Sequence, residues 1–159
     1  MCLIIDKGVC WRMYAPKTNP EAVPVIEWLF GPSGNLVYGG ANAAELMEHP
    51  QVVVILAKLR QAGKAVRLSD EKVDAEAKRI KDAHSPRTND VSILAIAKLS
   101  GARTLWTADA DLMNDFRNTT IVPSPRGSVY GKIEHRELLC HRPGCSRWRA
   151  EKKGGGRRR

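Results

Sequence analysis

The stretch from Asn89 to Asp111 constrains the fold of this chain more than any other part of the sequence. Asn89-Asp90 leads into the most apolar helix pattern in the chain, and a short strand pattern over 103–107 follows it. Two acids, Asp109 and Asp111, come directly after that strand. Open α/β sheets bind their ligands at the carboxyl ends of strands. The stretch therefore predicts half of an acidic site at the edge of a sheet.

The order of strand and helix patterns along the chain is typical of a parallel sheet covered on both faces. Short apolar runs of the kind found in buried strands alternate with helical patterns. We therefore expect an α/β fold, a three-layer α/β/α sandwich with a mostly parallel central sheet. The expected strands are 2–6, 36–38, 65–68, 103–107 and 119–122, and the expected helices begin at Asn19, Asn42, Val52, Ser69 and Asn89, with a last one over 131–139.

Length and composition fit one globular domain. The chain has 159 residues, of which 43% are hydrophobic and 27% charged, which is typical of soluble proteins. No apolar stretch approaches the roughly 20 residues of a membrane span, and the apolar start is too short for a signal peptide. We therefore expect a cytoplasmic protein without a membrane partner. Its four cysteines, Cys2, Cys10, Cys140 and Cys145, are expected to be reduced thiols rather than a disulfide framework.

The positive charge is concentrated at the carboxyl terminus. Seven of the nine net positive charges lie in residues 140–159, so we expect a folded domain over 1–139 and a basic, flexible tail over 140–159. Such a tail binds phosphate backbones without sequence preference, or it only solubilises the protein; both interpretations stay open. Trp148 either stacks on an unpaired base or docks the tail on the domain. The candidate nucleic-acid contacts are Arg147, Trp148, Arg149, Lys152 and Lys153.

Potential zinc ligands also gather near this tail. His135, Cys140, His141 and Cys145 lie at short intervals, and the spacing of the two cysteines is within the range of zinc sites. Four ligands in one short segment seldom close a tetrahedron without a second pair elsewhere. The sequence therefore favours reduced thiols beside a basic arm over a zinc site.

Each acid near the predicted sheet edge has an ordinary structural explanation as well as a functional one. A turn aspartate, a helix cap and a solvated helix charge are all common. With Asn89 available as a cap, Asp90 is expected in the first turn of its helix. The joint placement of several acids at one end of one sheet favours the functional interpretation. The acids concerned are Asp6, Glu45, Asp90, Asp109 and Asp111.

Clustered carboxylates of this kind predict a hard divalent cation. Two carboxylates about 4 Å apart repel by about 4 kcal/mol at an effective dielectric constant near 20, so they bind cations or have raised pKa values. Oxygen ligands without His or Cys select Mg²⁺ or Mn²⁺, and a pair of such ions suits phosphodiester hydrolysis. A calcium loop starting at Asp109 is excluded because Asn114 replaces its glycine. An aspartyl phosphotransferase is disfavoured because Gly8 stands where a second acid is expected.

These motifs resemble those of the PIN-domain nucleases, including the VapC-like toxins of bacterial toxin–antitoxin pairs. An apolar strand ends in an acid in Leu3-Ile4-Ile5-Asp6, and a helical Glu follows in Asn42-Ala-Ala-Glu45-Leu46. Asn89-Asp90 opens an alanine-rich helix, which leads to Thr107-Ala-Asp109-Ala-Asp111. The resemblance covers roughly residues 1–125 and implies an α/β/α sandwich that cleaves RNA with Mg²⁺ or Mn²⁺.

The resemblance also implies roles for single residues. The catalytic acids would be Asp6, Glu45, Asp90 and Asp109, with Asp111 as a further metal ligand, and Thr107 and Asn89 would hydrogen-bond beside them. RNA, an antitoxin protein and a second copy of the chain are the implied partners.

Two positions depart from the family pattern. Lys7 stands where many relatives keep a small polar residue, and Leu112 replaces an aromatic side chain. A lysine beside Asp6 could compete with a metal. The alternative to a ribonuclease is therefore a non-catalytic PIN-like module that binds nucleic acid or a protein, with Lys7 in place of the cation.

Overall fold

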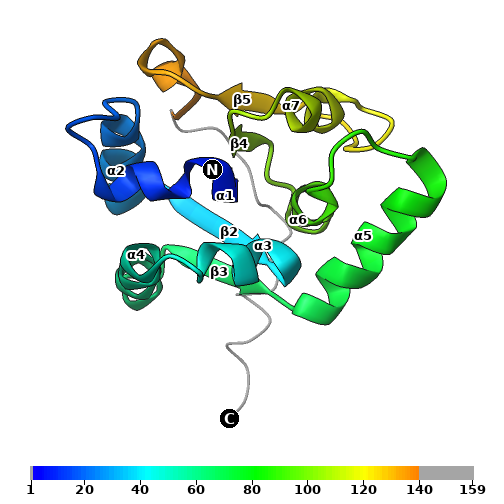
Figure 1. Cartoon of the computed structure of the whole chain (residues 1–159), viewed down its shortest axis with the longest axis horizontal. Coiled ribbons are helices and arrows are strands. Elements are labelled where there is room, and N and C mark those ends of the chain that lie inside the picture. The colour runs from blue at the N-terminus through cyan, green and yellow to red at the C-terminus, as the bar shows by residue number, and fades with distance from the viewer. Residues whose placement is uncertain (1, 140–159) are drawn as a thin grey trace.

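The centre of the molecule is a five-stranded sheet in the order β3-β2-β1-β4-β5. The computed structural model describes residues 2–139, and all neighbouring strands within them are parallel. Helices cover both faces of the sheet (Figure 1), so the predicted α/β/α sandwich is confirmed. The strands are β1 (Cys2–Ile5), β2 (Asn35–Gly39), β3 (Ala65–Leu68), β4 (Thr104–Trp106) and β5 (Ser128–Tyr130), and the helices are α1 (Lys7–Cys10), η1 (Trp11–Tyr14), α2 (Ala22–Phe30), α3 (Gly40–Leu46), α4 (Pro50–Gln61), α5 (Asp70–His84), α6 (Val91–Ser100), α7 (Ala110–Arg117) and η2 (Ile133–Leu139).

Strand β1 is buried on both faces of the sheet. Successive side chains of a strand point to opposite faces, and all four residues of β1 are buried. Leu3 and Ile5 belong to one hydrophobic core, together with residues of α1 to α4. Cys2 and Ile4 belong to the other core, which α5, α6 and α7 complete. The continuous apolar run at the start of the sequence therefore forms a central strand, as expected for a parallel sheet.

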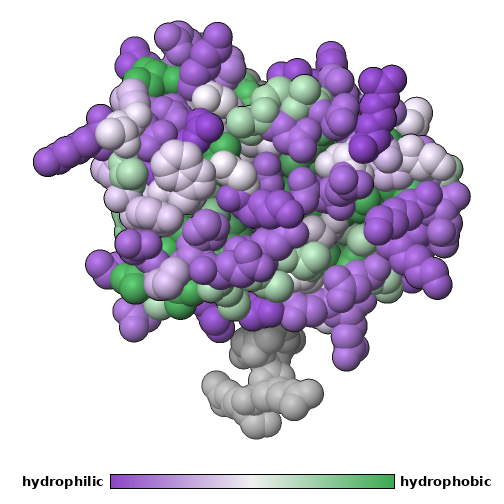
Figure 2. Space-filling view, in the orientation of Figure 1, coloured by the Kyte–Doolittle hydropathy of each residue, from purple (hydrophilic) through white to green (hydrophobic). Residues whose placement is uncertain are grey.

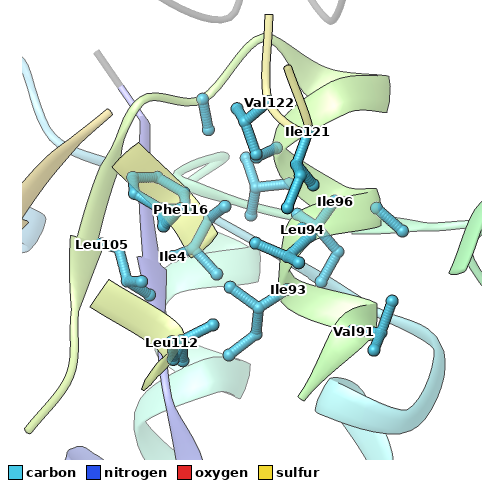
Figure 3. Packing of buried hydrophobic residues seen from close by; sticks show 14 of the residues in the cluster. Ile4, Val91, Ile93, Leu94, Ile96, Leu105, Leu112, Phe116, Ile121 and Val122 are labelled. Carbon is cyan, nitrogen blue, oxygen red and sulfur yellow. The ribbon is translucent and has the colours of Figure 1, made fainter. Parts of the chain in front are cut away.

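Helix α6 is the centre of the second core. Ile93, Leu94 and Ile96 pack with Ile4 of β1 and Phe116 of α7 in the same hydrophobic cluster (Figure 3). The helix ends at Gly101, whose φ of 81° is in the left-handed region that glycine adopts readily. The apolar pattern predicted this buried helix correctly.

The strand order reverses between β1 and β4. After β1 the chain adds β2 and β3 on one side, and then crosses the sheet to add β4 and β5 on the other side. Ligands of open α/β sheets bind beyond the carboxyl ends of the strands at such a reversal. Asp6 follows β1 and Asp109 follows β4, so the topology places both acids beside this point.

The predicted fifth strand over 119–122 is wrong. Ile121 and Val122 are buried in the second core, but both of their amides donate to the Asn118 carbonyl in a turn. The fifth strand is Ser128–Tyr130 instead, paired with β4. Two adjacent apolar residues before a proline satisfy the short apolar signal of a strand, although here they only fill the core.

Other expectations about the first half of the chain need correction. The chain forms helix α1 directly after Asp6 instead of a simple turn, and α2 begins at Ala22 rather than beside Asn19. Asn42 lies inside α3 and does not cap it. Cys2 is disulfide-bonded rather than a reduced thiol, whereas Cys10 is a free, buried cysteine.

Among residues 2–139, no helix is long and apolar enough to cross a membrane. Hydrophilic residues cover most of the face in Figure 2, and hydrophobic residues lie between them in small patches. Large exposed apolar side chains such as Phe30 and Val54 are about half exposed. Ion pairs between charged side chains also connect helices near the surface, as the contacts of Glu76 show.

Glu76 of helix α5 connects this helix to α6. Its side chain accepts from Lys98 of α6 at 2.7 Å and from Arg79 of its own helix at 2.8 Å, and it is only 11% exposed. The Lys98 ammonium, and then Arg79, lower the pKa of this carboxyl against the opposing effect of burial. The contribution of Glu76 to stability is therefore present at neutral pH and is lost as the pH falls through its lowered pKa.

We expect Glu76→Gln to lower the free energy of unfolding by about 1–3 kcal/mol at pH 7. The difference from the natural chain should shrink as the pH falls through the lowered pKa of Glu76 in the folded chain. Urea unfolding at pH 7 and at a series of lower pH values measures this. Asp82→Asn, an exposed change on the same helix, is the control and should be close to neutral. A loss that persists unchanged at low pH would contradict the role of the charge.

Candidate acidic site

Asp6 and Thr107 connect the ends of the two central strands. The Asp6 amide donates to the Trp106 carbonyl at 3.0 Å, which continues the pairing of β1 with β4. The Thr107 hydroxyl donates to Asp6 Oδ2 at 2.8 Å and accepts from the Asp109 amide at 3.0 Å. Thr107 is fully buried and Asp6 is 4% exposed. One hydroxyl therefore fixes the positions of both acids.

Asp109 has a structural role in addition to its place in the cluster. Its Oδ1 accepts from the amides of Asp111 and Leu112 at 2.9 and 3.2 Å, so it caps helix α7. Cap residues of this type stabilise a helix start by satisfying its free amides. The other oxygen, Oδ2, makes none of these capping bonds and remains available to a ligand.

Asp90 is held by a chain of hydrogen bonds from α7. The buried Asp115 accepts from the Thr88 amide at 2.8 Å, and the Thr88 hydroxyl accepts from the Asp90 amide at 3.0 Å. Asp90, not Asn89, is the residue that precedes α6, and its side chain makes no capping bond. The expectation that Asn89 caps the helix and that Asp90 lies in its first turn is therefore wrong. The Asp90 side chain nevertheless makes no capping bond to the helix.

Glu45 reaches the site from helix α3, which is tightly anchored. The Gly40 amide donates to Asp70 at 2.9 Å, and the side-chain amide of Asn42 donates to the Ile5 carbonyl at 3.0 Å. Gly40 has a φ of 53°, and a Cβ there would lie 2.6 Å from Val73. These contacts bind the helix to β1 and α5 and so fix where Glu45 lies.

Lys7 lies between two of the acids. Its ammonium is 3.1 Å from Glu45 Oε1 and 3.7 Å from Asp90 Oδ1. The hydrogen bond with Glu45, followed by the charges of Glu45, Asp90 and Asp6, raises the pKa of Lys7, so it is a cation at neutral pH. The lysine that the sequence marked as a departure is thus a direct partner of the acidic cluster.

The electrostatics of Asp6 are those of a buried carboxylate with acidic neighbours. Burial, and to a lesser extent the charges of Asp90 and Asp109, raise its pKa, while the Thr107 hydroxyl and the Gly8 amide lower it. Its second oxygen, Oδ1, is buried without a hydrogen-bond partner. An unsatisfied buried oxygen is costly, and a bound cation would remove that cost.

A thiol below the cluster is not a plausible nucleophile. Cys10 is buried, and burial followed by the charge of Asp6 raises its pKa to about 11. Thiols react as thiolates, so this one stays protonated and unreactive at neutral pH. The chemistry of the site is therefore that of its carboxylates.

The structure brings together most of the acids that the sequence suggested. Asp6 interacts electrostatically with Asp90 and Asp109, and Lys7 bridges Asp90 to Glu45. Asp111 is exposed in the first turn of α7 and contributes its amide to Asp109. Asn89 lines a cavity of about 310 Å³ beside Glu45 and Asp90. The residues of the predicted nucleic-acid arm, Arg147, Trp148, Arg149, Lys152 and Lys153, and the cysteines and histidine at 140, 141 and 145 lie outside the described residues.

Sequence reasoning missed the residues that support the cluster. Asp115 and Thr88 position Asp90 through backbone amides, and Asn42 attaches α3 to β1. The only signal for them in the sequence is a polar residue within or beside an apolar helix. That signal does not identify a partner that is 27 or 37 residues away.

The donor atoms of this site fit a hard divalent cation. Four carboxylates supply oxygen ligands of the kind that Mg²⁺ and Mn²⁺ prefer, and the buried Asp6 Oδ1 lacks a partner. Across residues 2–139, however, no three Asp, Glu, His or Cys side chains converge closely enough to hold a metal as they stand. The acids therefore have the right chemistry, and the Glu45 and Asp90 carboxylates pair with Lys7 instead of converging.

The family is decided by a match over most of the chain. The model of the PIN domain family matches residues 4–118, a range that contains all four clustered acids. The chain belongs to the PIN domain family. PIN domains are generally nucleases that act on nucleic acid and usually use divalent metals. Comparison with curated proteins gave no match, and neither did comparison with solved structures.

Thr107 provides a direct test of how this PIN domain holds its acids. We expect Thr107→Val to lower the free energy of unfolding by about 1–3 kcal/mol at pH 7, because Asp6 and the Asp109 amide both lose their partner. Thr107→Ser keeps the hydroxyl and should retain most of that stability. Urea unfolding of both variants measures the difference. Unchanged stability of Thr107→Val, or a loss in Thr107→Ser as large as that in Thr107→Val, would contradict the hydrogen-bond role.

Proposed function

We propose that this PIN domain is an endoribonuclease that hydrolyses RNA phosphodiesters at the Asp6–Glu45–Asp90–Asp109 cluster with Mg²⁺ or Mn²⁺. The observation that carries the proposal is the placement of acids after β1, on α3, at the start of α6 and after β4, beside the point where the strand order reverses. Among these acids, Asp6 has a buried oxygen without a partner. A structural set of acids would be expected to satisfy that oxygen.

Charge explains why a cation is needed. The cluster has four carboxylates and one ammonium group, so it is net negative. An RNA phosphate is negative as well, and the two repel unless a cation lies between them. The acids alone would exclude the substrate, and acids with bound divalent ions would attract it.

The residues of the chain have separate tasks in this proposal. Asp6, Asp90 and Asp109 would hold the metal, with Glu45 and the auxiliary Asp111 at its margin. A divalent ion held by these acids would lower the pKa of water and would stabilise negative charge on the leaving oxygen. Thr107 keeps Asp6 and Asp109 in register through its hydroxyl, and Asp115 holds the backbone at Thr88, which in turn holds Asp90. These bonds limit the movement of the acids during the reaction.

Two finer parts of the proposal rest on the sequence. The basic arm at 140–159 would raise RNA affinity through phosphate contacts. A role as the toxin of a toxin–antitoxin pair rests on the resemblance to VapC-like toxins, as do an antitoxin partner and a homodimer.

A second candidate function is favoured by Lys7. Its ammonium already pairs with Glu45 and Asp90, which is the arrangement expected of a PIN domain that has lost its metal and only binds nucleic acid or a protein. Two experiments separate this module from the nuclease.

The first experiment measures cleavage. Structured RNAs incubated with the purified chain and Mn²⁺ should be cut, and Asp90→Asn should reduce the rate at least a hundredfold, because the acid is lost without a change of shape. Asp6→Asn and Asp109→Asn should do the same, and EDTA should stop the reaction. Asp82→Asn removes an exposed acid outside the cluster and is the matched control. Full cleavage in EDTA, or by the Asp90→Asn chain, would rule the proposal out.

The second experiment measures binding without activity. An ion that binds only the folded state must raise the melting temperature. We expect Mn²⁺ to raise it in the natural chain, and Asp90→Asn to diminish the increase. A melting temperature that is independent of Mn²⁺ would favour the non-catalytic module.

A further inference from the structure

Lys7 contacts two acids of the cluster at the same time. It is the first residue of α1, directly after Asp6, and its ammonium lies 3.1 Å from Glu45 and 3.7 Å from Asp90. These acids come from different parts of the chain, 38 and 83 residues further on. A single ammonium thus joins the start of α6 to helix α3 across the acidic cluster.

The acids it joins would otherwise repel each other. Side chains of Glu45 and Asp90 are 26% and 15% exposed, so water screens their charges only in part. A cation between two such carboxylates is stabilising for the same reason that a metal would be. Lys7 therefore occupies the electrostatic position of a cation without providing a metal's empty coordination sites.

The lysine can also leave this position. Its side chain is 48% exposed, and it has a flexible four-carbon stem. Neither contact is bidentate, and solvent reaches the side chain. Since α1 is anchored by the buried Val9 and Cys10, the backbone of Lys7 stays in place while the ammonium moves into water.

We propose that Lys7 is a displaceable internal counter-ion of Glu45 and Asp90, and that a divalent cation binds this site only by displacing it. The proposal rests on the metal-dependent function above and adds a control of that site. Occupancy by Mg²⁺ or Mn²⁺ is then a competition between a tethered ammonium and the free ion. The chain consequently needs a higher metal concentration than the same acids would need without Lys7.

The competition also explains the arrangement of the acids in this structure. Among the described residues, no three carboxylates lie close enough together to hold a metal. Glu45 and Asp90 instead form ion pairs with the ammonium of Lys7. Removal of that ammonium leaves Glu45 and Asp90 without their shared partner. A divalent cation then becomes the best available partner for both acids and for the unsatisfied oxygen of Asp6.

Calorimetric titration of the full chain with MnCl₂ tests the proposal. Lys7→Met keeps the length of the side chain but removes the charge, and we expect it to bind Mn²⁺ at least tenfold more tightly than the natural chain. Lys7→Arg keeps the charge and should bind no more tightly than the natural chain. The increase in melting temperature on adding Mn²⁺ should likewise be larger for Lys7→Met.

Lys78→Met is the matched control. Lys78 lines the same cavity as Glu45 and Asp90, but it makes no ion pair among the described residues. Its loss changes the net charge beside the site by the same amount, through solvent that screens it. We expect less than a threefold change in Mn²⁺ affinity. An increase equal to that of Lys7→Met would assign the effect to overall charge and overturn the proposal.

The remaining outcomes separate this inference from the proposed function. Equal or weaker Mn²⁺ binding by Lys7→Met, with clear binding by the natural chain, overturns the role of Lys7 and leaves the nuclease proposal intact. Binding by Lys7→Met alone supports the role of Lys7 and overturns a metal-dependent activity in the natural chain. Absence of binding in both chains overturns both proposals.

Discussion

The hydroxyl of Thr107 is the interaction on which the arrangement of this site depends. It is buried between the ends of β1 and β4, donates to Asp6 and accepts from the backbone of Asp109. A hydroxyl can do both at once because it has one proton and two lone pairs. A carboxylate at this position could not donate, and an apolar residue would remove the hydrogen bonds to both Asp6 and the Asp109 amide. The pairing of the two central strands is thereby extended into the acidic cluster.

The strand order of the sheet explains why the acids lie beyond the ends of β1 and β4. At the strand-order reversal, the chains that leave β1 and β4 diverge to opposite faces of the sheet. Helix α3 contacts both α1 and α6. The acids therefore come from elements anchored in two hydrophobic cores, α6 in one, α3 in the other, and β1 and β4 in both. Rigid anchoring of like charges is possible only because those cores supply the stability that the repelling charges remove.

The central part of the fold and the acids of the site could be predicted from the sequence. The run Leu3-Ile4-Ile5 and the apolar helix from Val91 have local patterns that only a buried strand and a buried helix explain, so β1, α6 and the position of Asp6 followed from them. Strand β5 could not be found in this way. Its three residues are too few to show a period, and the nearby pair Ile121-Val122 gave a stronger apolar signal.

The supporting contacts escaped prediction for a different reason. Asp115 and Asn42 bind backbone amides and carbonyls of distant segments, and every residue type supplies those groups alike. No side-chain pattern therefore marks the partner. The contacts of Lys7 with Glu45 and Asp90 could be predicted only in part. The sequence showed a lysine beside Asp6, but it did not show which acids this lysine contacts.

The position of Lys7 in the chain gives it a property that a free ion lacks. A metal leaves the site when it is removed from solution, whereas Lys7 returns, because the peptide bond to Asp6 keeps it within reach at a high effective concentration. The acids are consequently never without a cation. This limits the repulsion that the folded state must bear in the absence of metal, and the same tether weakens metal binding by the amount that it stabilises the metal-free chain. A lysine next to the first acid of such a cluster therefore exchanges affinity for stability, and the two quantities should change in opposite directions whenever that residue is replaced.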